Sequence, residues 1–358
     1  MDMTTSTPRS TIDVTEVTAS SCLDECCSLL NATREHHSEV GRFDWLYLRN
    51  PDGPAIVWLL RESENGAAVG FTAALPRRMS VQGRERICWI GSDFSVLPKY
   101  RTLGLAVKLR RAAKDGIDAG RADFLYAHPN ERMAVIHTRV GHHPTGRMIR
   151  LARPLRVGTL VSDRVSSRAA GRIAGAVLDP VVRWGDGASW SRRRFEFEHL
   201  ATASFDARVD GLFDREGRQS ETIMGVRDAT YLNWRYGANP CARSEVVLAS
   251  KGNELCGYAI FVRDSDCLSI KDVFPCHRPE VVAGLLEEVR RIGYRTELQS
   301  VTMTLLDSNP MVAVLRSQGF RLRPESTEMY TYSRSDREWA PVVANPDLWQ
   351  LTVGDRDV

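Results

Sequence analysis

The sequence predicts an α/β protein (α+β, with a mixed sheet) built from two similar units in tandem. Two observations lead to this prediction. A strand, a tight turn and a helix follow one another over residues 92–118, and a seven-residue pattern with two aromatic residues occurs twice in the chain. The length of 358 residues allows two domains of ordinary size, and a hydrophobic content of 43% is enough for packed cores.

The bulk composition argues against several classes of protein. A net charge of +3 is too small to indicate nucleic-acid binding by itself, and no apolar run approaches the length of a membrane span. The first residues are small and polar and no apolar segment follows them, so we expect no secretory signal and a cytoplasmic protein. Eight cysteines are scattered without a C-x-x-C pair, so we expect no metal site.

The order of motifs along the chain suggests five segments. The first unit is expected to open with helices over residues 12–40. The expected segments are a flexible N-terminus (1–11), a first unit (12–150), an arginine-rich linker (151–200), a second unit (201–335) and a C-terminal tail (336–358).

The stretch at 92–118 predicts a site for an anion. Residues 92–97 alternate as in a strand, which Pro98 stops, and apolar residues from Leu105 to Ile117 then recur at helical spacing. A strand that enters a helix through a short turn points several backbone N–H groups, and the positive end of the helix dipole, at one place. Gly104 in this turn would let a pyrophosphate approach the backbone.

The repeated pattern is W-x-Y-x-x-N-P, and it begins at Trp45 and again at Trp234. Later matches keep the same order at slowly falling offsets, for example Asp93 with Asp272 and Asn130 with Asn309. Matches in a fixed order at drifting offsets are typical of a duplicated unit. We therefore interpret the chain as two copies of one α/β unit.

The two copies differ where the first copy has its anion site. At an offset of 179 residues, the second copy replaces Arg101, Gly104 and Ala106 with Glu280, Ala283 and Leu285. A carboxylate at the start of the helix would repel a pyrophosphate, and a leucine would crowd it. The first copy is therefore predicted to bind a cofactor through its pyrophosphate. The second copy is predicted to shape the pocket for a substrate or to serve as a scaffold.

The turn resembles the pyrophosphate-binding loop of the GNAT superfamily of acyl-CoA-dependent N-acyltransferases. The pattern V-x-P-x-Y-R-x-x-G-x-A runs from Val96 to Ala106 in the strand–turn–helix context that the superfamily requires. Tandem members with two such domains are known. The resemblance implies acetyl-CoA, or another short acyl-CoA, as co-substrate, and it assigns cofactor binding to Val96, Arg101, Thr102, Leu103, Gly104, Leu105, Ala106 and Asn130.

A second resemblance concerns the proton donor. In the superfamily the unit N-x-x-A-x-x-x-Y-x-x-x-G-F carries a tyrosine that protonates the departing thiolate. Here Asn130 and Gly141 match, but the tyrosine position holds His137 and the phenylalanine position holds His142. Neutral histidine can also donate a proton, so the resemblance implies His137 as general acid. The alternative is that His137 only packs and that the thiolate leaves with help from solvent.

Two residues are candidate bases for the proton of the attacking amine. Asp93 lies on the cofactor strand three residues before Val96, although a structural role is its main rival because the second copy keeps Asp272. His128 ends the following strand and is the second candidate. The pair His142–His143 is expected to be exposed.

Basic residues occur in two further places. Lys108, Arg110, Arg111 and Lys114 on the predicted helix could reach the 3′-phosphate of CoA, although charged helix faces are usually only solvated. Residues 150–194 hold ten arginines and three aspartates. This stretch could contact a membrane surface or a phosphorylated substrate, and the alternative is a solvated linker with a packed helix.

These patterns predict an N-acetyltransferase that transfers an acyl group from acyl-CoA directly to an amine of a small-molecule acceptor. The repeated pattern and residues 349–355 resemble acetyltransferases linked to surface-polysaccharide assembly, which suggests an amino sugar. Alternatives are a Fem-type transferase that uses aminoacyl-tRNA, a protein-lysine acetyltransferase, and a non-catalytic acyl-CoA sensor. A Fem-type enzyme would not need the R-x-x-G-x-A turn, and the oligomeric state is not indicated.

Overall fold

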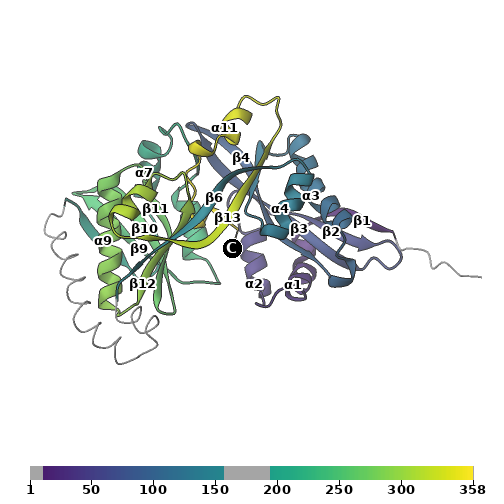
Figure 1. Ribbon diagram of the computed structural model, residues 1–358, viewed down its shortest axis with the longest axis horizontal. Helices are drawn as coiled ribbons and strands as arrows, with labels where there is room; N and C mark the ends of the chain where they lie inside the picture. The colour runs from purple at the N-terminus through teal and green to yellow at the C-terminus, as the bar shows by residue number, and fades with distance from the viewer. Residues whose placement is uncertain (1–10, 157–193, 358) are drawn as a thin grey trace, which may run out of the picture.

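The computed structural model describes residues 11–156 and 194–357. The predicted flexible N-terminus and most of the arginine-rich linker lie outside these residues. The described part is a mixed α/β structure in which a thirteen-stranded sheet runs through the molecule (Figure 1). This is the fold class that the sequence predicts.

The first half consists of the elements up to residue 154. They are β1 (Ile12–Thr18), η1 (Ala19–Ser21), α1 (Leu23–Asn31), α2 (Val40–Phe43), η2 (Asp44–Leu48), β2 (Ile56–Glu62), β3 (Ala68–Val81), β4 (Arg84–Val96), η3 (Pro98–Tyr100), α3 (Leu103–Asp118), β5 (Phe124–Ala127), α4 (Glu131–Arg139) and β6 (His143–Pro154).

The second half repeats much of this order and adds a C-terminal segment. Its elements are β7 (Glu196–Leu200), α7 (Arg208–Glu216), β8 (Ile223–Gly225), α8 (Ala229–Leu232), η5 (Asn233–Gly237), β9 (Ser244–Lys251), β10 (Glu254–Asp264), β11 (Cys267–Phe274), α9 (Pro279–Arg295), β12 (Ser300–Leu306), α10 (Met311–Ser317), β13 (Arg321–Ser333), α11 (Ala340–Ala344), η6 (Pro346–Leu348) and η7 (Val353–Asp355).

The strand order in the sheet is symmetric about its centre, because corresponding strands of the two halves lie at equal distances from the middle. It is β1-β2-β3-β4-β5-β13-β6-β12-β11-β10-β9-β7, with β8 paired to β3 at the side. Each half contributes five neighbouring strands, and in each half a parallel pair (β4 with β5, β11 with β12) lies on the side nearer the centre. This symmetry is what two copies of one unit would produce, so the structure agrees with two tandem domains.

The two halves exchange their last strands. β13 comes from the second half, but it pairs with β5 of the first half through Phe124–Ala127. β6 comes from the first half and pairs with β12 of the second. The two strands also pair with each other and cross the centre of the molecule (Figure 1). The limits 12–150 and 201–335 therefore remain a prediction, because each copy completes its sheet with a strand from the other.

The opening segment differs from its prediction. Residues 12–40 were expected to be helical, but Ile12–Thr18 form β1, an edge strand paired with β2 along its whole length. The alternation of apolar and polar residues in this stretch suits a half-buried strand, and helix begins only at Leu23. The prediction was wrong because a seven-residue alternation was merged with the helical pattern that follows it.

The repeated W-x-Y-x-x-N-P segments meet at the centre of the symmetric arrangement. Both form a short π-helix, η2 in the first half and η5 in the second. The Trp45 and Trp234 rings stack 5.2 Å apart. Each indole Nε1 donates a hydrogen bond to the backbone carbonyl of the other tryptophan, at 2.9 and 3.1 Å. The repeat therefore builds the contact between the copies.

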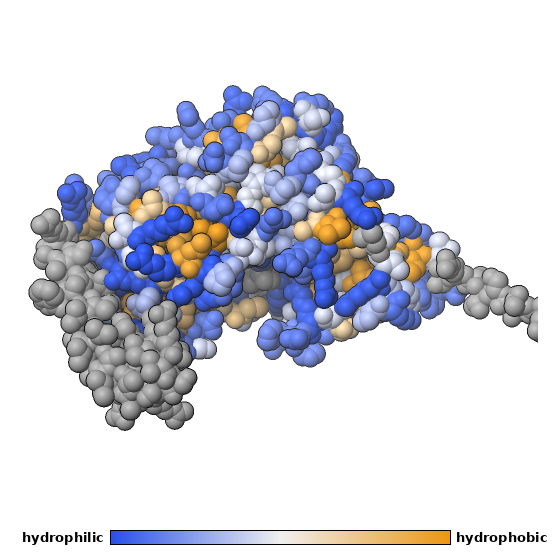
Figure 2. All heavy atoms as spheres, viewed as in Figure 1, coloured by the Kyte–Doolittle hydropathy of each residue, from blue (hydrophilic) through white to orange (hydrophobic). Residues whose placement is uncertain are grey.

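The surface of the molecule is mixed in character. Figure 2 shows hydrophobic residues in patches on both halves, with hydrophilic residues between and around them. None of the helices in the described part of the chain is long and apolar enough to cross a bilayer.

Candidate acyl-transfer site

The predicted anion site lies at the exposed start of α3. Thr102 is the N-cap of this sixteen-residue helix, and its side chain accepts a hydrogen bond from the Leu105 N–H. The Arg101 Nε donates to the Val96 carbonyl at 3.0 Å, which fixes the turn. A Cβ atom on Gly104 would have no atom within 4 Å. Packing inside the protein therefore does not require a glycine here, and the space beside the helix start is open.

The matching place in the second copy is filled. α9 begins with Pro279 and has no side-chain cap. Val281 and Leu285 of its first turns are both buried, and Val281 packs so closely on Gly257 that a Cβ on that glycine would lie 2.6 Å from it. The two helix starts therefore differ in packing: Thr102 is exposed at the start of α3, whereas Val281, at the corresponding position of α9, is buried.

β4 runs on past its pairing with β5 toward the exposed start of α3, and we name this unpaired stretch of β4 the β4–β5 gap. β4 and β5 pair in parallel from Cys88 to Gly91 on β4, and the pairing ends there although β4 continues to Val96. On its other side β4 has an irregularity opposite Thr72 and Ala73, which leaves Asp93 as an extra residue. A bulge beside a place where strands separate is common next to active sites.

The Asp93 carboxylate lies in the gap region but already has strong partners. It is buried, and it forms an ion pair with Arg42 at 2.8 Å and another with Arg34 at 3.3 Å. The Tyr47 hydroxyl donates to the same carboxylate at 2.9 Å. Burial would lower the pKa of Arg42, but Asp93 raises it above its ordinary value. These contacts occupy both carboxylate oxygens, so they favour a structural role.

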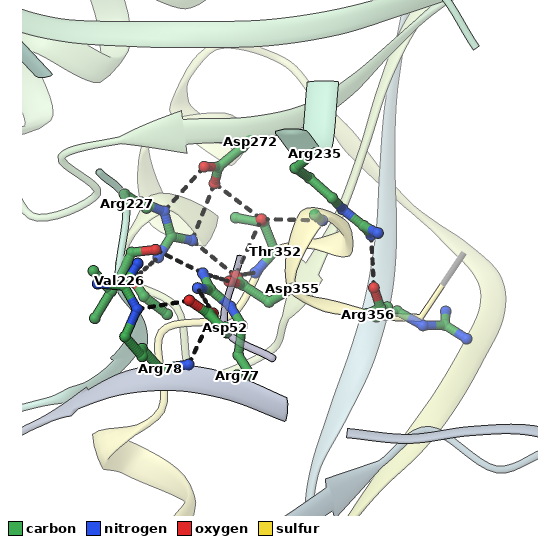
Figure 3. A network of polar contacts seen from close by, with 12 residues as sticks. Asp52, Arg77, Arg78, Val226, Arg227, Arg235, Asp272, Thr352, Asp355 and Arg356 are labelled. Atoms are coloured by element: carbon green, nitrogen blue, oxygen red, sulfur yellow. Dashed lines mark hydrogen bonds and ion pairs between the residues drawn. The ribbon is translucent and has the colours of Figure 1, made fainter. Parts of the chain in front are cut away.

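The second copy contains the same arrangement around Asp272. The Arg227 guanidinium donates to both carboxylate oxygens at 3.0 and 3.1 Å, and the Tyr258 hydroxyl donates at 2.9 Å. Thr352 and Asp355 of the C-terminal segment join this network, as Figure 3 shows. The network continues to the first half, because it also contains these residues: Asp52, Arg77 and Arg78.

His137 is buried in α4 and is joined to His142. Their Nδ1 atoms are 2.8 Å apart, and the rings make an edge contact. Burial, followed by the nearby charge of Arg110, lowers the pKa of His137 well below 6.5 and that of His142 to about 3. Both imidazoles are therefore neutral at physiological pH. The prediction of an exposed His142–His143 pair was wrong for His142, which stacks on Tyr332, and right for His143.

His128 follows the last residue of β5 and is buried without partners. Neither of its ring nitrogens has a hydrogen-bond partner among the described residues. Burial lowers its pKa well below 6.5, so the ring is neutral and at least one nitrogen can accept a proton or a hydrogen bond. Its ring contacts Tyr126 edge-on, with centroids 5.8 Å apart.

Two other predicted residue sets have different surroundings. Asn130 is exposed at the start of α4, where its side chain caps the helix by accepting from the Met133 N–H at 3.0 Å. Of the four basic residues on α3, Arg111 and Lys108 are exposed, as expected for a solvated face. Arg110 is not: its side chain faces the sheet and is buried. The expectation that Arg110 reaches toward an external phosphate was therefore wrong.

Comparisons with known proteins extend this description. No protein-family model matches the sequence, and a search of curated proteins finds no match. Among solved structures, the chain is similar to a probable N-acyltransferase from Enterococcus faecalis, with a TM-score of 0.64 and 11% identity over 91% of this chain and 73% of that one.

Two further solved structures have the same arrangement. One is a tandem GNAT protein from the clavulanic acid biosynthesis pathway, with a TM-score of 0.54 and 16% identity over 91% of this chain and all of that one. The other is N-myristoyltransferase from Saccharomyces cerevisiae with bound myristoyl-CoA, with a TM-score of 0.56 and 12% identity over 96% of this chain and 85% of that one. The chain has the GNAT superfamily fold.

The GNAT fold explains why the exposed start of α3 and the opening between β4 and β5 lie side by side. Among the described residues, no group of three His, Cys, Asp or Glu side chains could hold a metal ion.

Sequence reasoning missed some residues around this candidate site. Arg42 and Tyr47 hold Asp93, and only Tyr47 carried a signal, because it belongs to the repeated pattern. Arg110 carried a signal that was overlooked, because helical spacing places it on the same face as the buried Ala113 and Ile117. The segments that resembled polysaccharide-linked acetyltransferases lie between the copies, since Trp45 stacks on Trp234 and Trp349 is fully buried. They hold the copies together, so they say little about the acceptor.

Proposed function

We propose that the protein transfers a short acyl group, acetyl in the simplest case, from acyl-CoA to an amine of a small-molecule or amino-sugar acceptor. One observation carries this proposal: the first turn of α3 is exposed and open at Gly104, whereas the matching turn of α9 carries the carboxylate of Glu280 and has Val281 and Leu285 buried against the protein. A helix N-terminus with free N–H groups and space beside it suits a pyrophosphate. All eight cysteines are free thiols, which is consistent with the cytoplasm.

The cofactor residues follow from this placement. We assign the pyrophosphate to the backbone of the turn and first helical residues: Arg101, Thr102, Leu103, Gly104, Leu105 and Ala106. The arm of CoA would then extend into the opening between β4 and β5, past Val96, with Asn130 on its other side. This direction brings the thioester toward the bulge at Asp93.

The transfer needs one bond to form and one to break. The amine nitrogen attacks the thioester carbonyl carbon, the C–N bond forms, the C–S bond breaks, and the amine proton is finally carried by the CoA thiol. We assign to His137 a hydrogen bond that stabilises the departing thiolate, while the proton that the amine loses passes through water to the sulfur. The His137 Nδ1 is held by His142, and a neutral imidazole whose other nitrogen carries hydrogen can donate a hydrogen bond from it.

The base assignment favours His128 over Asp93. His128 is neutral and its nitrogens have no partner among the described residues, so it can accept the proton of the amine directly or through water. Asp93 is held by Arg42 and Tyr47, so we assign it the positioning of α2 and of the bulge. The low pKa makes His128 only a modest base. A modest base is adequate here, because the amine nitrogen becomes positively charged when it bonds to the carbonyl carbon and then loses its proton readily.

The alternatives stay distinguishable. The open turn at α3 argues against a Fem-type enzyme, which would not need it. An acyl-CoA sensor would bind CoA but release none with any amine, whereas an enzyme would release free CoA with at least one amine of a panel that includes amino sugars and lysine peptides. His137→Ala beside the wild type would then show whether release depends on this residue.

The first test is calorimetric binding of acetyl-CoA to the wild type and to Gly104→Glu. A carboxylate placed at the turn should repel the pyrophosphate and weaken binding by about 100-fold or more, since like charges in contact cost several kcal/mol. The matched control is Ala283→Glu, the same charge at the corresponding position of α9, which should leave binding unchanged.

Binding that survives Gly104→Glu and is lost in Ala283→Glu would contradict the proposal, because the second copy would then hold the cofactor. Absence of binding to the wild type would overturn the acyl-CoA assignment. Melting temperatures of both variants, measured in parallel, separate loss of binding from loss of folding.

A further inference from the structure

Arg110 is a buried cation that forms no ion pair or hydrogen bond with the residues that the structure describes. Its residue is 3% exposed, and its Nε and Nη1 atoms form no hydrogen bond with any residue that the structure describes. Burial lowers the pKa of Arg110 from 12.5 to about 10. Unpaired buried charges are costly, and in folded proteins they are normally paired or hydrogen-bonded. A buried guanidinium with unused hydrogen-bond donors is a candidate partner for a negatively charged group of a ligand.

The guanidinium lies at the closed end of the opening between β4 and β5. Gly91 and Ala127 form the last pair of the two strands before they separate. A Cβ atom on Gly91 would lie 2.8 Å from the Arg110 Nη1 and 3.1 Å from the Ala127 Cβ. The absence of a side chain at Gly91 makes room for the guanidinium at this point. The Phe94 ring lies on another side, with its centroid 5.7 Å away.

The carboxyl groups nearby do not neutralise Arg110. Asp357 is near enough for its charge to act on the guanidinium, but no hydrogen bond joins the two. Asp93 is occupied by Arg42. The other titratable neighbours are His137 and His142. Both rings are neutral, so neither provides a negative charge to balance Arg110. The closed end of the gap is thus positively charged, with two N–H groups free.

The direction of CoA identifies which part of the substrate reaches this place. If the pyrophosphate lies at the start of α3, as in the proposed function on which this inference rests, the acyl group is the end of CoA farthest from that turn. An extended arm entering the gap therefore brings the acyl group to the closed end last. We propose that Arg110 binds a terminal carboxylate on the acyl group, so that the preferred donor is the CoA thioester of a short dicarboxylic acid.

The chemistry of transfer is unchanged by this preference. The carbonyl carbon still forms its bond to the amine nitrogen and loses the CoA sulfur, while the distal carboxylate remains ionised and paired with Arg110. The product would carry an amide with a free carboxylate at its end. Specificity of this kind is strong, because a neutral acyl chain leaves the buried guanidinium without a partner.

Binding measured by calorimetry tests this without knowledge of the acceptor. The probes are CoA, butyryl-CoA and succinyl-CoA; the last two have four-carbon acyl groups and differ in charge. We expect succinyl-CoA to bind about 10- to 100-fold more tightly than butyryl-CoA, as for a hydrogen bond to a charged group. Arg110→Gln should remove this preference, while Arg111→Gln, the same change at an exposed neighbour, should keep it. Malonyl-CoA and glutaryl-CoA then measure the length of the pocket.

A second variant guards against a folding defect. Gly91→Ala leaves Arg110 in the chain but places a methyl group where its guanidinium lies, so the preference for succinyl-CoA should fall while CoA itself still binds. Equal affinity for butyryl-CoA and succinyl-CoA in the wild type would overturn this inference and leave the proposed function standing. Loss of all three ligands in Arg110→Gln would also overturn it, because Arg110 would then serve CoA binding in general. No binding of any CoA by the wild type would overturn the proposed function itself.

Discussion

The two copies keep the same buried acid but differ at the start of one helix. Asp93 and Asp272 each accept hydrogen bonds from an arginine and a tyrosine inside the protein. The first turn of α3 is open at Gly104, whereas in the first turn of α9 Val281 is buried and packs against Gly257. The aspartate network that both copies share is therefore expected to serve folding, and the helix start that differs is the better candidate for function. This division identifies site residues better than their chemistry alone does.

The largest expected effect on stability comes from the buried aspartate that both copies share. Asp93→Asn and Asp272→Asn should each lower the free energy of unfolding by about 3–5 kcal/mol, because each change weakens the pairing of a buried arginine. Chemical denaturation measures this, and Asp206→Asn, at an exposed ion pair, should change it by less than about 1 kcal/mol. A stable Asp93→Asn beside an unstable Asp272→Asn would break the comparison and return Asp93 to the candidate bases.

The next largest effect is on the pH dependence of stability, and it comes from three histidines of the first copy. Burial holds the pKa values of His128, His137 and His142 below the unfolded value of 6.5. The unfolded chain then binds protons that the folded chain does not, so stability is complete above pH 6.5 and is lost as the pH falls. The slope is about 1.4 kcal/mol per pH unit for each such histidine.

Denaturation between pH 7 and pH 4.5 measures that slope. His142→Gln should reduce it, whereas His277→Gln, at a half-exposed histidine of the second copy that pairs with Glu216, should not. An equal slope in wild type and His142→Gln would mean that this ring takes up a proton in the folded protein.

The smallest expected effect on stability comes from the contact between the two copies. Trp45→Phe and Trp234→Phe each remove one indole N–H that donates to the other copy, and each should cost about 1 kcal/mol. The symmetric geometry predicts similar values for the two variants. The double variant should cost less than their sum, because the two rings stack on each other. Strongly unequal values would show that only one copy depends on this contact.

Local patterns in the sequence were enough to predict part of this structure. Pro98, Gly104 and the helical spacing after them lie next to one another, so β4, the turn and α3 follow from short-range rules. The repeat was visible because Trp45 and Trp234 stand in the same local pattern. The exchange of β6 and β13 was not predictable, since pairing between strands 170 residues apart leaves no local periodicity.

The burial of individual polar side chains was the second feature that was not predicted from the sequence. Arg110 lies on the helix face of Ala113 and Ile117, which packs on the sheet, and Gly91 leaves room there for its guanidinium. Its charge alone suggested a solvated position, and charge was the wrong guide. His142 and His143 are adjacent and chemically identical, but one lies under Tyr332 and the other is exposed. Such differences depend on what the neighbouring element offers, and that neighbour is distant in the sequence.

The crossed strands set an order on the making of this protein. A ribosome produces β5 some two hundred residues before β13, which pairs with it, so the edge of the first sheet stays unpaired until nearly the whole chain has emerged. A chain that stops before β13 would leave that edge of β5 without its partner strand. Fragments that lack β13 should therefore be prone to aggregation, because an unpaired strand edge can pair with another chain.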